Sequence, residues 1–83
     1  MNQVQINFSA HTYTFSFQSQ EWADWFWREY QTNIRKYKGG TMAFIRCYTE
    51  DLTDEYAITK VEKFNTRTKK TLLMYPLDKH TSL

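Results

Sequence analysis

The amino-acid sequence predicts a small α+β domain in which one long helix packs across one face of an antiparallel or mixed sheet. Three observations support this fold class. Apolar residues alternate with period 2 near the N-terminus, recur with a helical period over residues 19–40, and form further strand-like runs after the helix. A chain of 83 residues has room for one domain, which we place at residues 1–76, with residues 77–83 as a flexible tail.

The N-terminal segment predicts a β-hairpin. Every second residue is apolar in residues 4–8 and again in residues 13–17. A four-residue loop over residues 9–12 would pair Phe8 with Tyr13 and bring all six apolar side chains onto one face. The hairpin is therefore expected to have one apolar and one polar face.

This hairpin contains no Asp, Glu, Lys or Arg. Exposed edge strands usually carry charges or proline, which prevent pairing with other chains. Two explanations stay open: both strands lie inside the sheet, or a partner or a second copy of the chain covers an edge. Under the second explanation, polar side chains of the hairpin are candidate partner contacts, namely Gln5, Asn7, Thr14 and Ser16.

Residues 19–40 predict one continuous helix, which carries all three tryptophans. Its apolar residues fall within an arc of about 140° on a helical wheel, bounded by Trp22 and Trp27. Ser19 can cap the first turn, and the glycine pair at 39–40 can end the last one. Because the apolar stripe must be buried, we expect it to pack on the sheet.

Trp25 lies about 60° outside this arc, among polar residues. One explanation is local, with the indole lying over aliphatic parts of its neighbours or under a loop. The other is that Trp25 anchors a protein partner, because exposed tryptophan is common among residues that dominate binding energy. The candidate contacts around Trp25 are Glu21, Glu29 and Lys36.

The residues after the glycine pair are expected to complete the sheet. The apolar run over 41–48 predicts a central strand, and the acidic segment 49–55 predicts a solvated loop. Residues 56–64 and 70–75 predict a second hairpin that ends before Pro76. The predicted order is β-β-α-β-β-β. Its first elements are similar in order to the β-grasp fold, which implies nothing about function.

The second hairpin is rich in basic residues, with Glu62 as its one acid. A net charge of +2 is too small to favour nucleic acid by itself, but a basic β-ribbon can follow phosphate groups. The simpler explanation is a solvated hairpin tip. Nucleic-acid binding is therefore the alternative function, acting through Lys60, Lys63, Arg67, Lys69 and Lys70.

No catalytic or metal-binding motif is recognisable. Cys47 lies in an apolar run, and His11 and His80 are far apart in sequence with no Cys or His at metal-ligand spacing. We therefore expect a protein without enzymatic activity, cofactor or metal. No segment predicts a membrane span or signal peptide, and the single cysteine favours a reducing compartment, so we expect a cytoplasmic protein.

These features favour a non-catalytic protein-binding module that acts as a small inhibitor or adaptor. Aromatic residues make up 18% of the chain, and such residues are enriched in protein interfaces. Phage-encoded proteins that disable a host enzyme or a defence complex are one class of this kind. Self-association through the uncharged hairpin is a further expectation.

Overall fold

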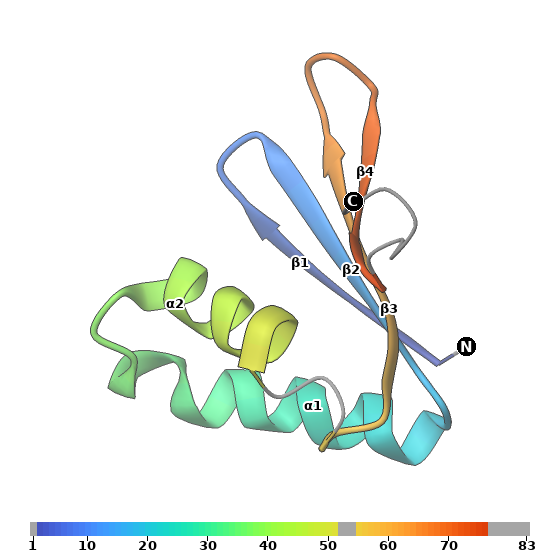
Figure 1. The fold of residues 1–83 in the computed structure, drawn as a ribbon. Helices are drawn as coiled ribbons and strands as arrows, with labels where there is room; N and C mark the ends of the chain where they lie inside the picture. Colours follow the sequence, from blue (N-terminus) through green and yellow to red (C-terminus); the bar gives the residue numbers. More distant parts are fainter. Residues whose placement is uncertain (1, 52–54, 77–83) are drawn as a thin grey trace.

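Four strands form one antiparallel sheet in the order in which they occur in the chain (Figure 1). The computed structural model describes residues 2–51 and 55–76 of this α+β domain, so the predicted tail at 77–83 lies outside the described residues. The strands are β1 (Gln3–Phe8), β2 (His11–Phe17), β3 (Ile58–Asn65) and β4 (Thr71–Tyr75). The helices are α1 (Gln20–Asn33), the 3-10 turn η1 (Ile34–Lys36), α2 (Gly40–Arg46) and the π-helical turn η2 (Cys47–Asp51).

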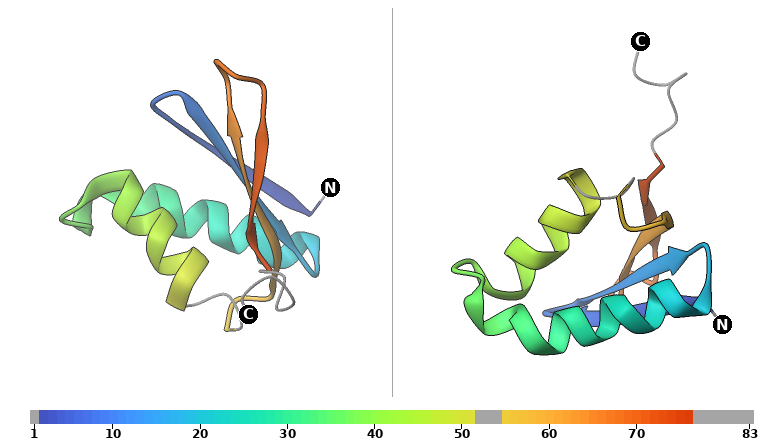
Figure 2. Two further views of the ribbon diagram at one scale, coloured as in Figure 1. Left: turned by 45° about the horizontal axis from the view of Figure 1, so that its top comes forward. Right: turned by 90° about the horizontal axis from the view of Figure 1, so that it is seen from below.

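Helices α1 and α2 lie on the same face of the sheet, and residues 2–51 and 55–76 place no helix on the other face (Figures 1 and 2). The core between the two layers is mainly aromatic. Phe26 of α1 is fully buried at its centre, with ring centroids 4.7 Å from Phe15, 5.0 Å from Phe17, 5.3 Å from Phe44 and 5.1 Å from Tyr48. Contacts at tilted or edge-on angles such as these stabilise aromatic pairs beyond the area that they bury.

The first hairpin forms as predicted, but its register differs by two residues. The loop contains only Ser9 and Ala10, so Phe8 pairs with His11 rather than with Tyr13. Ser9 makes this tight turn with a positive φ of 57°. Because side chains alternate with period 2, a shift by two residues keeps the same face inward, and the apolar face is confirmed except for Phe8, which is 39% exposed.

The prediction of one helix over residues 19–40 is wrong at its C-terminal end. Ser19 caps α1 as expected, with the Trp22 backbone N–H donating to Ser19 Oγ over 3.3 Å. The helix ends at Asn33, and the chain turns back through η1 so that Tyr37 contacts Phe44 with ring centroids 5.3 Å apart. The C-terminal part of the apolar stripe thus packs on a second helix instead of the sheet.

The predicted central strand over residues 41–48 is also wrong, because this segment forms α2 and the start of η2. Phe44, Ile45 and Tyr48 are buried on one side, whereas Arg46 is exposed, which is a helical rather than an alternating pattern. A short apolar run cannot distinguish a buried strand from a buried helix by period alone. Gly40, expected to end a helix, instead begins α2 with a φ of 67°.

The second hairpin is confirmed, although β3 and β4 are each one residue shorter than the predicted strands at 56–64 and 70–75. Its turn is held by Asn65, whose Oδ1 accepts hydrogen bonds from the backbone N–H groups of Arg67 and Thr68, at 2.9 and 3.1 Å. The tips of the two hairpins are joined at Thr66, whose N–H and hydroxyl both donate to the Ala10 carbonyl, at 2.8 and 3.0 Å. These bonds add a contact between the two hairpin tips to the continuous pairing of β2 with β3.

Candidate protein-binding edge

Strand β1 lies at one edge of the sheet, with β2 as its neighbour (Figure 1). Among residues 2–51 and 55–76, no strand pairs with its outer side. The explanation that both strands of the uncharged hairpin lie inside the sheet is therefore wrong. The chain leaves an edge without charge or proline open to pairing, which is the arrangement that proteins normally avoid.

The outward-facing backbone groups of β1 belong to its odd-numbered residues. Asn2 directs its carbonyl toward β2, where it accepts a hydrogen bond from the Phe17 N–H over 2.8 Å. In an antiparallel pair, successive residues direct their N–H and C=O groups alternately toward and away from the neighbouring strand. Gln3, Gln5 and Asn7 therefore direct their backbone donors and acceptors toward the open side.

The polar side chains predicted as partner contacts lie together on the face of the sheet away from the helices. Three pairs of uncharged side chains on this face join β1 to β2 through hydrogen bonds, which order the side chains. Gln3 Nε2 donates to Ser16 Oγ (3.3 Å), Gln5 Nε2 donates to Thr14 Oγ1 (3.4 Å), and Thr12 Oγ1 donates to Asn7 Oδ1 (2.8 Å).

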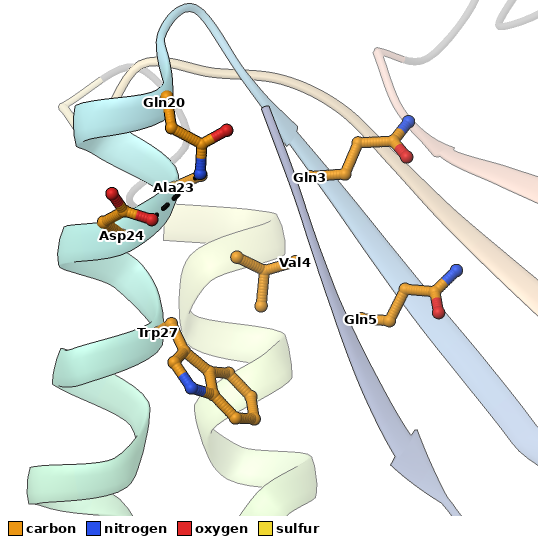
Figure 3. Close-up of a pocket in the computed structure, with 7 residues that line it drawn as sticks. All are labelled: Gln3, Val4, Gln5, Gln20, Ala23, Asp24 and Trp27. Atoms are coloured by element: carbon orange, nitrogen blue, oxygen red, sulfur yellow. Dashed lines mark hydrogen bonds between the residues drawn. The ribbon is translucent and has the colours of Figure 1, made fainter. Parts of the chain in front are cut away.

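A groove of about 300 Å³ lies between β1 and α1 (Figure 3). The side chains of Gln3 and Gln5 point away from α1 (Figure 3), so it is the backbone of β1 that faces the groove at these positions. The open edge and the groove are thus one continuous surface. Its lining residues are Gln3, Val4, Gln5, Gln20, Ala23, Asp24 and Trp27.

The α1 wall of the groove combines one large apolar side chain with one carboxylate. The Trp27 indole reaches toward β1 and is 41% exposed, while Ala23 and Val4 are buried beside it (Figure 3). Asp24 Oδ1 accepts a hydrogen bond from Gln20 Nε2 over 2.9 Å. The helical wheel placed Trp27 within the buried stripe. The sequence pattern did not identify Trp27 as a groove residue, because the groove depends on how far α1 lies from the edge of the sheet.

Trp25 is half-buried on another side of α1. Its ring stacks on Tyr56 with centroids 4.7 Å apart and meets Trp22 edge-on at 5.8 Å. This contact agrees with the local explanation, in which the segment before β3 covers Trp25, and its role as a partner anchor stays a prediction. Trp22 is 37% exposed at the rim of a shallow hollow of about 490 Å³, which is lined by Glu21, Trp22, Asp24, Trp25 and Arg28.

The structure does not bring all the predicted neighbours of Trp25 together. Glu21 lines the same hollow as Trp25. Glu29 lies one turn after Trp25 on α1 and accepts a hydrogen bond from Asn33 Nδ2 over 2.6 Å, whereas Lys36 lies in η1, beyond the end of α1. Glu21 and Glu29 therefore stay beside Trp25 as candidate contacts.

The five basic residues of the second hairpin do not share one face. Lys60 lies on the helix-free face, where its Nζ is 3.5 Å from Glu62 Oε1. Lys63 lies on the opposite face, with its Nζ 6.0 Å from the centroid of the Tyr13 ring. Lys63 and Lys70 help to line a hollow of about 360 Å³ near His11, and Arg67 and Lys69 are exposed in the turn. The binding of nucleic acid by this hairpin stays a prediction.

The described residues contain no group of three or more His, Cys, Asp or Glu side chains placed to hold a metal ion. Cys47 is half-buried in η2. No helix in residues 2–51 or 55–76 is both long and apolar enough to cross a bilayer. Comparison with models of known protein families, with curated proteins and with solved structures found no match to this chain.

Proposed function

We propose that this protein is a non-catalytic protein-binding module that docks a partner on the open edge of β1. The observation that carries this proposal is that β1 presents outward-facing backbone groups at Gln3, Gln5 and Asn7 with no charge or proline to block pairing. Each of these residues can donate one hydrogen bond to an added strand and accept another.

The two edges of the sheet differ in a way that supports this role. Strand β4, at the other edge, is flanked by Lys70 and Pro76, both of which hinder the addition of a further strand. Strand β1 has no such flanking residue, and the groove beside it gives room for the side chains of a partner. The edge of β1 is thus the better docking surface.

A small domain that occupies a segment of another protein can act as an inhibitor or adaptor without chemistry of its own. We propose further that this chain is a phage-type protein, which acts in the cytoplasm by disabling a host enzyme or a defence complex. The aromatic side chain of Trp27, which is exposed beside the edge of β1, would add apolar area to the contact.

Proline at position 5 tests the proposal. The Gln5 N–H points away from β2, so Gln5→Pro removes a donor from the open edge and keeps the β1–β2 ladder. Gln5→Ala keeps this N–H and is the matched control, and Leu72→Ser changes the opposite edge, where Leu72 is 61% exposed.

The immobilised wild-type protein and these variants would be exposed to host lysate, with and without nuclease. We expect a protein that survives nuclease treatment to be retained by wild type, Gln5→Ala and Leu72→Ser, and to be lost with Gln5→Pro. Equal retention by Gln5→Pro would show that the edge is not the docking surface. Retention that disappears with nuclease would favour nucleic-acid binding by the second hairpin.

A further inference from the structure

We infer that the groove between β1 and α1 selects a particular kind of segment. It binds an extended stretch of a partner protein as a fifth strand of the sheet, with a basic residue beside Asp24 and an apolar residue against Trp27, two positions apart. This inference rests on the proposed function, because it specifies which segments the open edge accepts.

The extended conformation follows from what forms the two walls of the groove. One wall is the backbone edge of β1 at Gln3 and Gln5, whose side chains point to the other side of the sheet (Figure 3). Backbone donors and acceptors at every second residue match an extended chain and no other regular structure. A segment bound there would direct alternate side chains into the groove and onto the helix-free face.

The apolar preference comes from Trp27. Its indole is 41% exposed, although it lies beside the buried residues Val4 and Ala23 (Figure 3). An aliphatic side chain on an added strand would cover this ring and remove apolar surface of both partners from water. A polar side chain at the same position would gain no such contact.

The basic preference comes from Asp24. Within the described part of the chain it is the one charged residue that lines the groove, and β1 contributes no charge. Asp24 accepts a hydrogen bond from the neutral amide of Gln20, and the one ion pair among residues 2–51 and 55–76 joins Lys60 to Glu62. A lysine or arginine on the added strand would therefore meet a carboxylate that has no ion-pair partner among the described residues, and such a pair contributes to selectivity more than to affinity.

The two groups on α1 are also close enough together for neighbouring groove-facing side chains of one strand, although the two repeats differ by about 2 Å. Asp24 and Trp27 are three residues apart on α1, a rise of about 4.5 Å, and side chains on one face of a strand recur about every 6.8 Å. In Figure 3, Asp24 lies nearer the Gln3 end of the groove and Trp27 nearer the Gln5 end, with Val4 between them. Groove-facing side chains of an added strand would lie opposite the even-numbered residues of β1, which share the inward face of Val4. Adjacent groove-facing side chains of an added strand would thus reach both groups.

Synthetic heptapeptides provide the test. In the first peptide, threonine alternates with groove-facing positions that carry lysine and valine, in both orders. Matched peptides replace the lysine with glutamate or the valine with serine. Binding would be followed at low ionic strength through the backbone amide signals of isotope-labelled protein.

We expect the lysine–valine peptide to shift the amides of Gln3, Gln5 and Asn7 and to bind about fivefold more tightly than the glutamate–valine peptide. In Asp24→Asn, the two peptides should bind with about equal affinity. Glu21→Gln removes the same charge one turn earlier on α1, outside the groove, and should preserve the difference in affinity between the two peptides. Trp27→Ala should abolish the preference for valine over serine.

Three results would overturn the inference: equal binding of the lysine and glutamate peptides, an unchanged ratio in Asp24→Asn, or amide shifts confined to other strands. A concentration-dependent dimer with protected Gln3, Gln5 and Asn7 amides would place a second copy in the groove and would also overturn it. If the peptides fail while capture from lysate still depends on the N–H at position 5, the inference fails but the proposed function stands.

Discussion

The Trp25 indole stacks on the ring of Tyr56, with 4.7 Å between ring centroids and 9° between the ring planes. Tyr56 also lies 5.4 Å from Tyr48, at the end of the aromatic core. Trp25, which the helical wheel leaves outside the apolar stripe, thus joins α1 to the segment that leads into β3.

A double-mutant cycle on this pair tests its contribution. Trp25→Ala and Tyr56→Ala should each lower the free energy of unfolding by about 2 kcal/mol, because each removes a large, partly buried ring. The two effects should be coupled by about 0.5–1.5 kcal/mol, as expected for stacked aromatic rings. Urea unfolding of the four proteins would measure this coupling, and strictly additive effects would contradict the stacking.

The two glycines at the start of α2, Gly39 and Gly40, should respond to alanine for different reasons. A Cβ at position 39 would lie 2.7 Å from Ala43 Cβ, whereas at position 40 the space is open but φ is 67°. We expect Gly39→Ala to cost about 1–3 kcal/mol through overpacking, and Gly40→Ala about 1–2 kcal/mol through backbone strain.

Ala43→Gly separates these two causes. It removes the atom that a Cβ at position 39 would meet, so the double variant Gly39→Ala/Ala43→Gly should be more stable than the sum of the single effects predicts. The same change should not rescue Gly40→Ala. Stability would be measured by chemical denaturation. If Ala43→Gly rescued Gly39→Ala and Gly40→Ala equally, overpacking could not be the specific cause of the loss of stability in Gly39→Ala.

Stability should fall in strongly alkaline solution because of the core tyrosines. Burial raises the pKa of Tyr48 well above the ordinary value of 10.0, and the charges of Tyr37 and Glu29 act in the same direction. Burial likewise raises the pKa of Tyr13 and Tyr37. Since the folded state disfavours the tyrosinate, its full stability is present below about pH 10 and is lost as pH rises toward the folded-state pKa values.

Unfolding free energies measured between about pH 8 and about pH 12, with tyrosine ionisation followed by ultraviolet absorbance, would show this decline. Tyr48→Phe keeps the ring and removes one ionisable group, so its stability should fall less steeply than that of the wild type. A decline of equal steepness in Tyr48→Phe would show that the Tyr48 hydroxyl does not contribute.

Local sequence patterns were sufficient to predict both hairpins and the start of α1. Alternation fixed which faces of β1 and β2 point inward even though the predicted register differed by two residues, because both registers have the same parity. Ser19 marked the start of α1 through its capping hydroxyl. These features depend on residues that are close in the sequence, so one chain is enough to recognise them.

The second helix and the groove could not be predicted in this way. The apolar run around Phe44 fits a buried strand or a buried helix, and the choice depends on its packing against Phe26 and Tyr37. The groove depends on the distance between α1 and the edge of β1. Asp24 and Trp27 therefore gave no sequence signal that set them apart from other residues of the helix.

Amide hydrogen exchange along β1 would show whether this strand is an open edge that receives a partner. In the free protein, the amides of Gln3, Gln5 and Asn7 should exchange rapidly, whereas those of Val4 and Ile6, which point toward β2, should exchange slowly. In the complex with the captured partner, the three rapid amides should become protected. Slow exchange at these three positions in the free monomer, or unchanged rapid exchange in the complex, would contradict the account.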